Sequence, residues 1–339
     1  MKKSIAYLAA LSCVLCSAEA FAEIKPEYAY PCLSEGAELI SVSGPEVRID
    51  TYSGVVYSQP KGARGLAHLK MTILSPRTSD KKPAIVYLPG GGFMGADHEK
   101  YIVLRTALAR AGFVVAGAEY RAVPNVFPAI LEDGKAAVRY LRAHAGEYGV
   151  DPERIGLLGD SAGGYLVELM GTVNGEKGWD KGDFLDQSSD VQAVVSLYGI
   201  SDLTSIGEGL DQDEVHSSPA VTEALLLNGP AFGPFAGASV MSDMEKALNA
   251  SAIGHVDGSE PPFLLMHGTA DIVVSPMQSK HLYEALKEKN TDVRYVVVEG
   301  AKHGDSPWFQ QPITEIIVEW FKEKLGTPEK TGEGKGSNL

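Results

Sequence analysis

The sequence predicts an α/β protein built on a mostly parallel, twisted sheet with helices on both faces. Three observations indicate this class. The chain has short runs of β-forming apolar residues and longer amphipathic stretches, and the two alternate after residue 83. Strands that are apolar throughout are typical of a sheet covered on both sides. Ligands bind beyond the carboxyl ends of the strands in such sheets, so the chemically active side chains are expected there.

The elements follow in order along the chain. Period-2 patches around residues 47–57 and 66–74 predict two antiparallel strands near the start. Apolar runs then predict the parallel strands at residues 84–88, 113–116, 155–158, 193–197, 263–266 and 294–298. Amphipathic stretches predict the helices near residues 99–111, 129–148, 162–173, 277–289 and 312–324.

One long segment interrupts this alternation. Residues 204–251 contain no predicted strand, but they include a helical pattern at 221–227 and a loop rich in Gly and Pro at 228–235. An insertion of this length within a domain is usually functional, so we interpret it as a cap or lid beside the strand ends. A surface excursion without a function is the alternative.

The ends of the chain predict a secreted or periplasmic protein. A positively charged start, an apolar run and an Ala-Phe-Ala cleavage site indicate a signal peptide over residues 1–22. An uncleaved anchor and a lipoprotein are the less favoured alternatives. Residues 23–326 then form one α/β domain that includes the cap, and residues 327–339 form a disordered tail. No other stretch is apolar enough to predict a membrane span.

Composition narrows the possible partners. Lys and Arg number 30 against 44 Asp and Glu, and the net charge of −14 argues against nucleic acid and anionic membranes. Cys13 and Cys16 lie in the predicted signal peptide, which leaves Cys32 alone in the mature chain. No intramolecular disulfide is therefore expected, and stability must come from a packed core. The sequence does not indicate an oligomeric state.

Residues 159–163, Gly-Asp-Ser-Ala-Gly, contain the predicted nucleophile, Ser161. This pattern follows a strand run and precedes a helical pattern, as a nucleophile elbow requires. A sharp turn there raises the serine hydroxyl above the sheet edge, and the flanking glycines let strand and helix approach closely. The short pattern also occurs by chance, but this context favours a nucleophile.

A serine hydroxyl is a weak nucleophile until a base removes its proton. His303 follows the last predicted strand and is the predicted base; a surface loop histidine is the alternative. Asp271 follows the strand run at 263–266 and is the predicted acid that orients the imidazole. Asp202 is a rival acid, although it also suits a helix N-cap, and His267 is expected to brace the Asp271 loop.

A glycine run follows the first parallel strand and predicts an oxyanion hole. The expected donors are the backbone N–H groups of Gly91, Gly92 and Ala162. A phosphate-binding loop is the alternative for a glycine run. Because no Gly-Lys-Ser or Gly-Lys-Thr follows, nucleotide binding is disfavoured.

From about residue 82 to 325 these motifs resemble the α/β-hydrolase esterases, both the hormone-sensitive-lipase-like carboxylesterases and the acetyl-xylan and feruloyl types. The resemblance implies the α/β-hydrolase fold and ester hydrolysis. It rests on Gly90-Gly91-Gly92-Phe93, Tyr120-Arg121, Phe127-Pro128-Ala129, Asp133, Asp151-Pro152-Glu153-Arg154-Ile155, Gly159-Asp160-Ser161-Ala162-Gly163-Gly164, Asp271 and His303.

Two features refine the resemblance. The lipase-like group usually carries Asp-Pro-Leu-x-Asp at its acid, whereas residues 267–271 read His-Gly-Thr-Ala-Asp, which is similar to the carbohydrate esterases. The family's glycine run usually opens with His, but Pro89 stands there. Proline cannot make that histidine's hydrogen bonds, so the oxyanion loop is expected to be held differently.

These observations predict a secreted serine carboxylic ester hydrolase that acts through an acyl-enzyme, with no metal or cofactor implied. Its substrate is expected to be a small-molecule or carbohydrate ester with a short-chain or aryl acyl group, such as acetyl, feruloyl or galloyl. A serine peptidase of the same fold and a non-catalytic hydrolase-fold binding protein are the alternatives. The aromatic residues predicted to line the pocket, each of which could instead be core or cap packing, are Phe93, Tyr165, Phe232, Phe235 and Trp308.

Overall fold

The structure is a computed structural model that describes residues 35–38, 40, 47–62, 65–211 and 213–327. The chain divides into the units Met1–Glu46 and Val47–Leu339, and every element below belongs to the second. The predicted signal peptide, the three cysteines and all but the first residue of the predicted tail lie outside the described residues.

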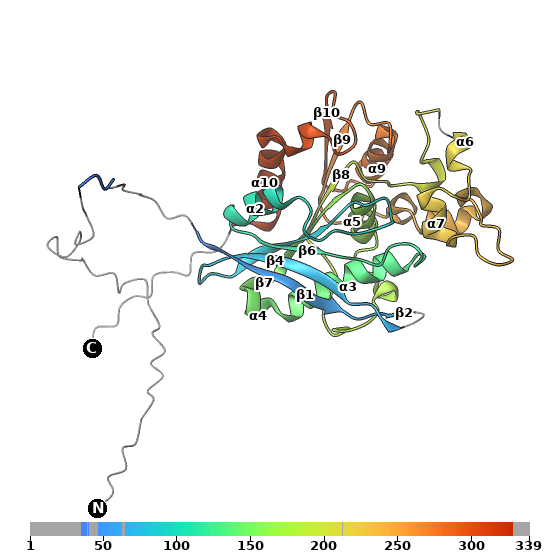
Figure 1. Ribbon diagram of the computed structural model, residues 1–339. Helices are drawn as coiled ribbons and strands as arrows, with labels where there is room; N and C mark the ends of the chain where they lie inside the picture. The colour runs from blue at the N-terminus through green and yellow to red at the C-terminus, as the bar shows by residue number, and fades with distance from the viewer. Residues whose placement is uncertain (1–34, 39, 41–46, 63–64, 212, 328–339) are drawn as a thin grey trace, which may run out of the picture. The chain divides into compact units, whose positions relative to one another are not determined.

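Among the described residues, one 8-stranded sheet forms the centre of the second unit, in the order β1-β4-β6-β5-β7-β8-β9-β10 (Figure 1). Pairs β1–β4 and β4–β6 are antiparallel and the others are parallel. The predicted fold class is thereby confirmed. The strands are β1 (Ile49–Ser58), β4 (Leu69–Pro76), β5 (Lys82–Leu88), β6 (Val114–Ala118), β7 (Val150–Asp160), β8 (Ala193–Leu197), β9 (Phe263–Gly268) and β10 (Val293–Val298), with β2 (Lys61–Gly62) and β3 (Gly65–Leu66) pairing separately.

The register of the parallel strands brings their carboxyl ends to one edge. Leu88 of β5 pairs with Gly159 of β7, and Asp160 pairs with Leu197 of β8. Leu197 pairs in turn with Met266 of β9. The loops that follow β5, β7, β9 and β10 therefore emerge close together, although they are up to about 200 residues apart in the sequence.

Helices cover both faces of the sheet because successive strand residues point to opposite sides. α2 (Ile102–Arg110) and α10 (Gln311–Leu325) pack on one face and contact each other (Figure 1). α3 (Ala129–Ala143), α5 (Ala162–Thr172) and α9 (Pro276–Glu288) pack on the other. Short 3-10 turns η1 (Lys177–Trp179) and η5 (Ser306–Phe309) lie in the connections.

Two predicted elements differ from the structure. The predicted helix at 129–148 is divided at His144 into α3 and the short α4 (Ala145–Tyr148), which ends at Gly149 in a left-handed conformation. Strand β10 is only partly buried, with Arg294 and Val297 exposed. It pairs with β9 alone, so it is an edge strand and not a strand covered on both faces.

The segment between β8 and β9 includes the predicted cap region, 204–251. Its elements are η2 (Leu203–Ser205), α6 (Asp213–His216), α7 (Thr222–Asn228), η3 (Val240–Ser242), α8 (Met244–Asn249) and η4 (Ala252–His255). Near its start, the Gln278 side-chain oxygen of α9 accepts hydrogen bonds from Ser201 N and Asp202 N at 3.0 and 2.8 Å. Near its end, Tyr165 of α5 donates to Ala250 O at 2.7 Å. No helix in the described part of the chain is both long and apolar enough to cross a membrane.

Candidate active site

Ser161 lies in the sharp turn between β7 and α5, with φ 54° and ψ −120°. A positive φ is rare for a residue that has a side chain, and it is found where surrounding contacts enforce it. A Cβ added to Gly163 would lie 2.0 Å from Leu88 O, and one added to Gly159 would lie 2.2 Å from Gly163 O. The glycines of the motif therefore permit the close strand–helix contact that raises Ser161 above the sheet edge.

The structure brings the predicted nucleophile, base and acid into one chain of hydrogen bonds. His303 Nε2 lies 2.8 Å from Ser161 Oγ, and His303 Nδ1 lies 2.7 Å from Asp271 Oδ2. His303 follows β10 and Asp271 follows β9. When Nδ1–H donates to the carboxylate, Nε2 is left to accept the serine proton, which is the tautomer that a general base requires.

Asp271 is held as a carboxylate by several donors. Its Oδ1 accepts from Val273 N and Val274 N at 2.9 and 3.0 Å, while Oδ2 accepts from His303. Burial by itself would raise the pKa of Asp271, but hydrogen bonds from His267 and His303 hold the pKa well below its usual value. The group therefore stays ionised and can stabilise a positive imidazolium.

The neighbouring His267 fixes the Asp271 loop, as its position in the sequence suggested. Its Nε2 lies 3.4 Å from Asp271 Oδ2 and 3.1 Å from Val274 O, and its Nδ1 lies 2.7 Å from Ser279 Oγ. The rival acid Asp202 instead caps η2, because its Oδ1 accepts from Thr204 N at 2.8 Å. The N-cap interpretation of Asp202 thus agrees with the structure.

The predicted oxyanion residues surround the same turn. Gly92 and Ala162 line the cavity beside Ser161, and Gly92 has φ 58°, a conformation that glycine adopts without strain. Gly91 precedes this turn, and its carbonyl accepts a hydrogen bond from Met94 N at 3.0 Å.

Asp160 and Tyr120 hold the glycine loop that follows β5, a role that their positions in the sequence did not indicate. Buried Asp160 accepts from Gly90 N at 2.9 Å and from Lys100 Nζ at 2.6 Å. The Tyr120 hydroxyl donates to Pro89 O. The loop is therefore fixed through the carbonyl of Pro89 and through its glycine neighbour, which is how it is held without the family's usual histidine. Asp160 lies inside the serine motif, whereas no sequence pattern marks Lys100.

A cavity of about 300 Å³ opens beside Ser161. Its walls are mostly apolar. Ile206 and Val221 come from the inserted segment, residues 204–251, whereas Phe93, Ile200 and Val273 come from other loops at the strand ends. Its size is near the lower end for ligand pockets, roughly 300–1,000 Å³, which suits a small acyl or aryl group.

Of the aromatic residues predicted to line this pocket, Phe93 does so and the others do not. Tyr165 is fully buried behind Phe93, edge-on at 5.1 Å between ring centroids. Trp308 is buried edge-on against Tyr198, whose ring also contacts His303. Phe232 and Phe235 are exposed residues of the α7–η3 loop. Tyr165 and Trp308 are thus core residues that do not line this cavity, in agreement with the alternative of core packing.

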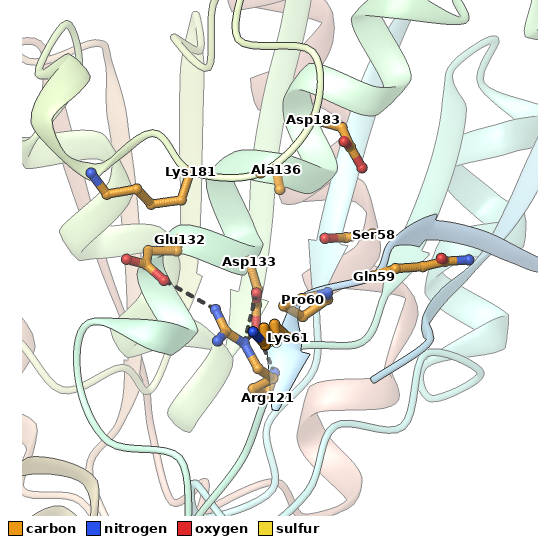
Figure 2. A pocket seen from close by; sticks show the side chains of 11 residues that line it. Ser58, Gln59, Pro60, Lys61, Arg121, Glu132, Asp133, Ala136, Lys181 and Asp183 are labelled. Atoms are coloured by element: carbon orange, nitrogen blue, oxygen red, sulfur yellow. Dashed lines mark hydrogen bonds and ion pairs between the residues drawn. The ribbon is translucent and has the colours of Figure 1, made fainter. Parts of the chain in front are cut away.

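A second cavity of about 300 Å³ lies near β2, away from Ser161 (Figure 2). Figure 2 shows Arg121 directed at Glu132 and Asp133, which it contacts at 3.1 and 2.8 Å. Lys61 and Lys181 add charge to its rim. Arg121 Nε and Nη2 are both hydrogen-bonded, so Arg121 joins the loop after β6 to Glu132 and Asp133 of α3. Within the described residues, no group of three or more His, Cys, Asp or Glu side chains is placed to hold a metal ion.

Comparison with curated proteins finds relatives that are named as ester hydrolases. A protein from Mycobacterium tuberculosis described as "Probable carboxylic ester hydrolase LipM" is 29% identical over 61% of this chain and 45% of its own length. The Arabidopsis thaliana "Probable isoprenylcysteine alpha-carbonyl methylesterase ICMEL1" is 25% identical over 74% of this chain and 51% of its own. The chain thus spans about half the length of the curated relatives it matches.

Solved structures with the same fold include esterases. A truncated carbohydrate esterase from gut microbiota superposes with a TM-score of 0.70 at 25% identity, covering 82% of this chain and 97% of the other. An esterase 2 from Thermogutta terrifontis, solved after phosphonylation by cyclosarin, has a TM-score of 0.63 at 24% identity, with coverages of 84% and 97%. The latter likeness bears on the fold alone.

The family model named BD-FAE matches residues 71–286, which include Ser161 and Asp271 and end before His303. This match covers more than half of the chain. The resemblance that the motifs predicted is confirmed, and the chain belongs to the BD-FAE family and has the α/β-hydrolase fold.

Proposed function

We propose that the protein is a serine carboxylic ester hydrolase that acts through an acyl-enzyme on Ser161. The observation that carries this proposal is the hydrogen-bonded chain from Ser161 through His303 to Asp271. At the Ser161 end of this chain lies a largely apolar cavity. The names of the relatives, which are esterases and a carboxylic ester hydrolase, support it.

In the first half-reaction, Ser161 Oγ attacks the ester carbonyl carbon while His303 Nε2 takes up the hydroxyl proton. The ionised Asp271 stabilises the imidazolium that results. The carbonyl oxygen becomes an oxyanion that accepts hydrogen bonds from the backbone N–H groups of Gly91, Gly92 and Ala162. His303 then returns the proton to the leaving alcohol as the bond between carbonyl carbon and alcohol oxygen breaks.

Water completes the second half-reaction. His303 removes a proton from the water, whose oxygen attacks the acyl carbon, and then protonates Ser161 Oγ as the acid leaves. Each step uses groups of this chain and water only, so the proposal needs no metal and no cofactor.

We propose an ester with a short or aryl acyl group, such as acetyl, feruloyl or galloyl, as the substrate. The small cavity and the likeness to a gut carbohydrate esterase support this class. We also propose that the chain is exported, because of its predicted signal peptide. N-terminal sequencing of protein recovered outside the cytoplasm should then find Glu23 first.

Hydrolysis of acetate, butyrate, octanoate, ferulate and gallate esters by wild type and by Ser161→Ala tests the proposal. Wild type should cleave at least one ester, and the variant should lose several orders of magnitude in rate. A reactive phosphonate should label wild type on Ser161. If wild type cleaves nothing and the phosphonate fails to label it, the protein is a non-catalytic member of its fold.

A further inference from the structure

A second histidine–carboxylate pair lines the cavity beside Ser161. His216 ends α6 and Glu223 lies in the first turn of α7, so both come from the inserted segment. His216 Nδ1 lies 2.5 Å from Glu223 Oε1. The side chains are 15% and 4% exposed, which makes the pair the main polar feature of an otherwise largely apolar wall.

The outer nitrogen of this histidine is unsatisfied. His216 Nε2 is buried and has no hydrogen-bond partner in the described structure. Buried polar atoms in native proteins are nearly always partnered, and an exception requires an explanation. The pair is otherwise complete, because Glu223 Oε2 also accepts from the Thr222 hydroxyl at 3.4 Å.

The carboxylate determines what the free nitrogen can bind. An ionised Glu223 accepts a hydrogen bond from His216 Nδ1–H, so in the neutral ring Nε2 presents a lone pair. A lone pair in an apolar wall is matched by an O–H donor. A hydroxyl group on a bound ester would be such a donor.

The position of His216 suits a hydroxyl at a distance from the reacting carbonyl. The residue also lines a neighbouring hollow of about 540 Å³, which shares Ile206 with the Ser161 cavity. A substrate that extends from Ser161 toward this hollow passes His216. Both a phenolic acyl group and a sugar ring carry a hydroxyl several bonds away from the ester.

We propose that His216, held by Glu223, determines specificity by accepting a hydrogen bond from a hydroxyl group of the ester substrate. The inference rests on the proposed esterase function and adds a recognition site to it. If the pair only joined α6 to α7, its removal would instead change the hydrolysis of every ester equally.

The test compares esters that differ by one hydroxyl. On the acyl side, methyl 4-hydroxycinnamate is paired with methyl cinnamate. On the alcohol side, the monoacetate of trans-1,2-cyclohexanediol is paired with cyclohexyl acetate. The quantity measured is the ratio of kcat/KM within each pair, because a general loss of activity cancels in that ratio.

Wild type should prefer the hydroxylated member of one pair, which identifies the hydroxyl as belonging to the acyl or to the alcohol part. His216→Phe keeps a ring of similar size but removes the acceptor, so this ratio should fall about tenfold, the value of one hydrogen bond. His216→Gln retains an acceptor oxygen and should recover part of the ratio. Val221→Ala changes the same wall without removing a polar group and should leave the ratio unaltered.

The possible failures are distinguishable. If wild type hydrolyses the esters without preferring the hydroxylated member in either pair, or if His216→Phe leaves the ratio intact, the inference is wrong and the esterase function stands. If wild type hydrolyses none of them and no phosphonate labels Ser161, the proposed function itself is wrong. Thermal unfolding of each variant confirms that the chain is folded.

Discussion

The His303–Asp271 pair and the His216–Glu223 pair lie beside one cavity and differ in what surrounds them. Asp271 accepts two backbone N–H groups as well as its histidine, whereas Glu223 accepts from His216 and a threonine hydroxyl. The outer nitrogen of His303 meets Ser161, while that of His216 is buried in the cavity wall without a partner. The same two side-chain types can therefore form a base or a binding site, depending on what the outer nitrogen faces.

Removing the histidines should give the largest contrast. His303→Ala removes the proposed general base, so kcat should fall by roughly 10⁵- to 10⁶-fold on every ester. His216→Ala leaves the base in place and should act mainly on substrate selectivity. Hydrolysis of 4-nitrophenyl acetate by both variants measures the contrast, and comparable losses in kcat would remove the distinction between the pairs.

Removing the acids sharpens the comparison. Asp271→Asn no longer stabilises the imidazolium or the required tautomer, and kcat should fall about 10⁴-fold. Glu223→Gln loosens only the proposed binding site, so the hydroxyl selectivity ratio should fall by less than about tenfold. Steady-state kinetics on the paired esters measure both kcat and the selectivity ratio. A large loss of kcat in Glu223→Gln would place that pair in the chemistry.

The oxyanion loop should show an intermediate effect. Tyr120→Phe removes the donor to Pro89 O, which lies two residues before the first proposed donor, Gly91, and Tyr120 does not line the Ser161 cavity. A small displacement of the loop should lower kcat by about tenfold, because positioning errors of 1 Å can cost roughly 10²-fold. KM should change little. An equal effect on KM and kcat would indicate general loosening of the site and not loss of positioning.

The smallest effect concerns stability at a buried acid that the mechanism does not use. Glu168 of α5 is fully buried, with Ser196 Oγ donating at 2.7 Å, and burial raises its pKa to about 8 from a usual value of 4.5. The folded state therefore keeps a proton that the unfolded state loses. This contribution to stability is fully present below pH about 4.5 and is lost as pH rises toward 8.

Glu168→Gln removes this titration. Its unfolding temperature, relative to that of wild type, should therefore increase between pH 5 and pH 8, roughly over the interval between the two pKa values. Asp271 has the opposite sign, because its lowered pKa adds stability above its usual value of 3.8 that is lost in stronger acid. If the unfolding temperatures of wild type and Glu168→Gln instead change in parallel with pH, then Glu168 is already ionised in the folded state over this range.

Much of the fold could be predicted because a parallel sheet leaves a distinct pattern of fully apolar runs. The positions of Ser161, Asp271 and His303 could be predicted because each follows such a run in the order that the fold requires; their catalytic roles remain predictions. The edge position of β10 was not predicted, because its run of valines outweighed the charged Arg294 within the strand. His216 and Glu223 belong to no motif, and only the folding of the insertion brings them to the cavity.

The inserted segment is fastened near both ends, by Gln278 at Ser201 and Asp202 and by Tyr165 at Ala250. Changes in sequence or length between these points should leave the hydrogen bonds among Ser161, His303 and Asp271 in place, since no residue of the segment takes part in them. An exchange of the segment between two relatives should transfer preference for an ester in a single step.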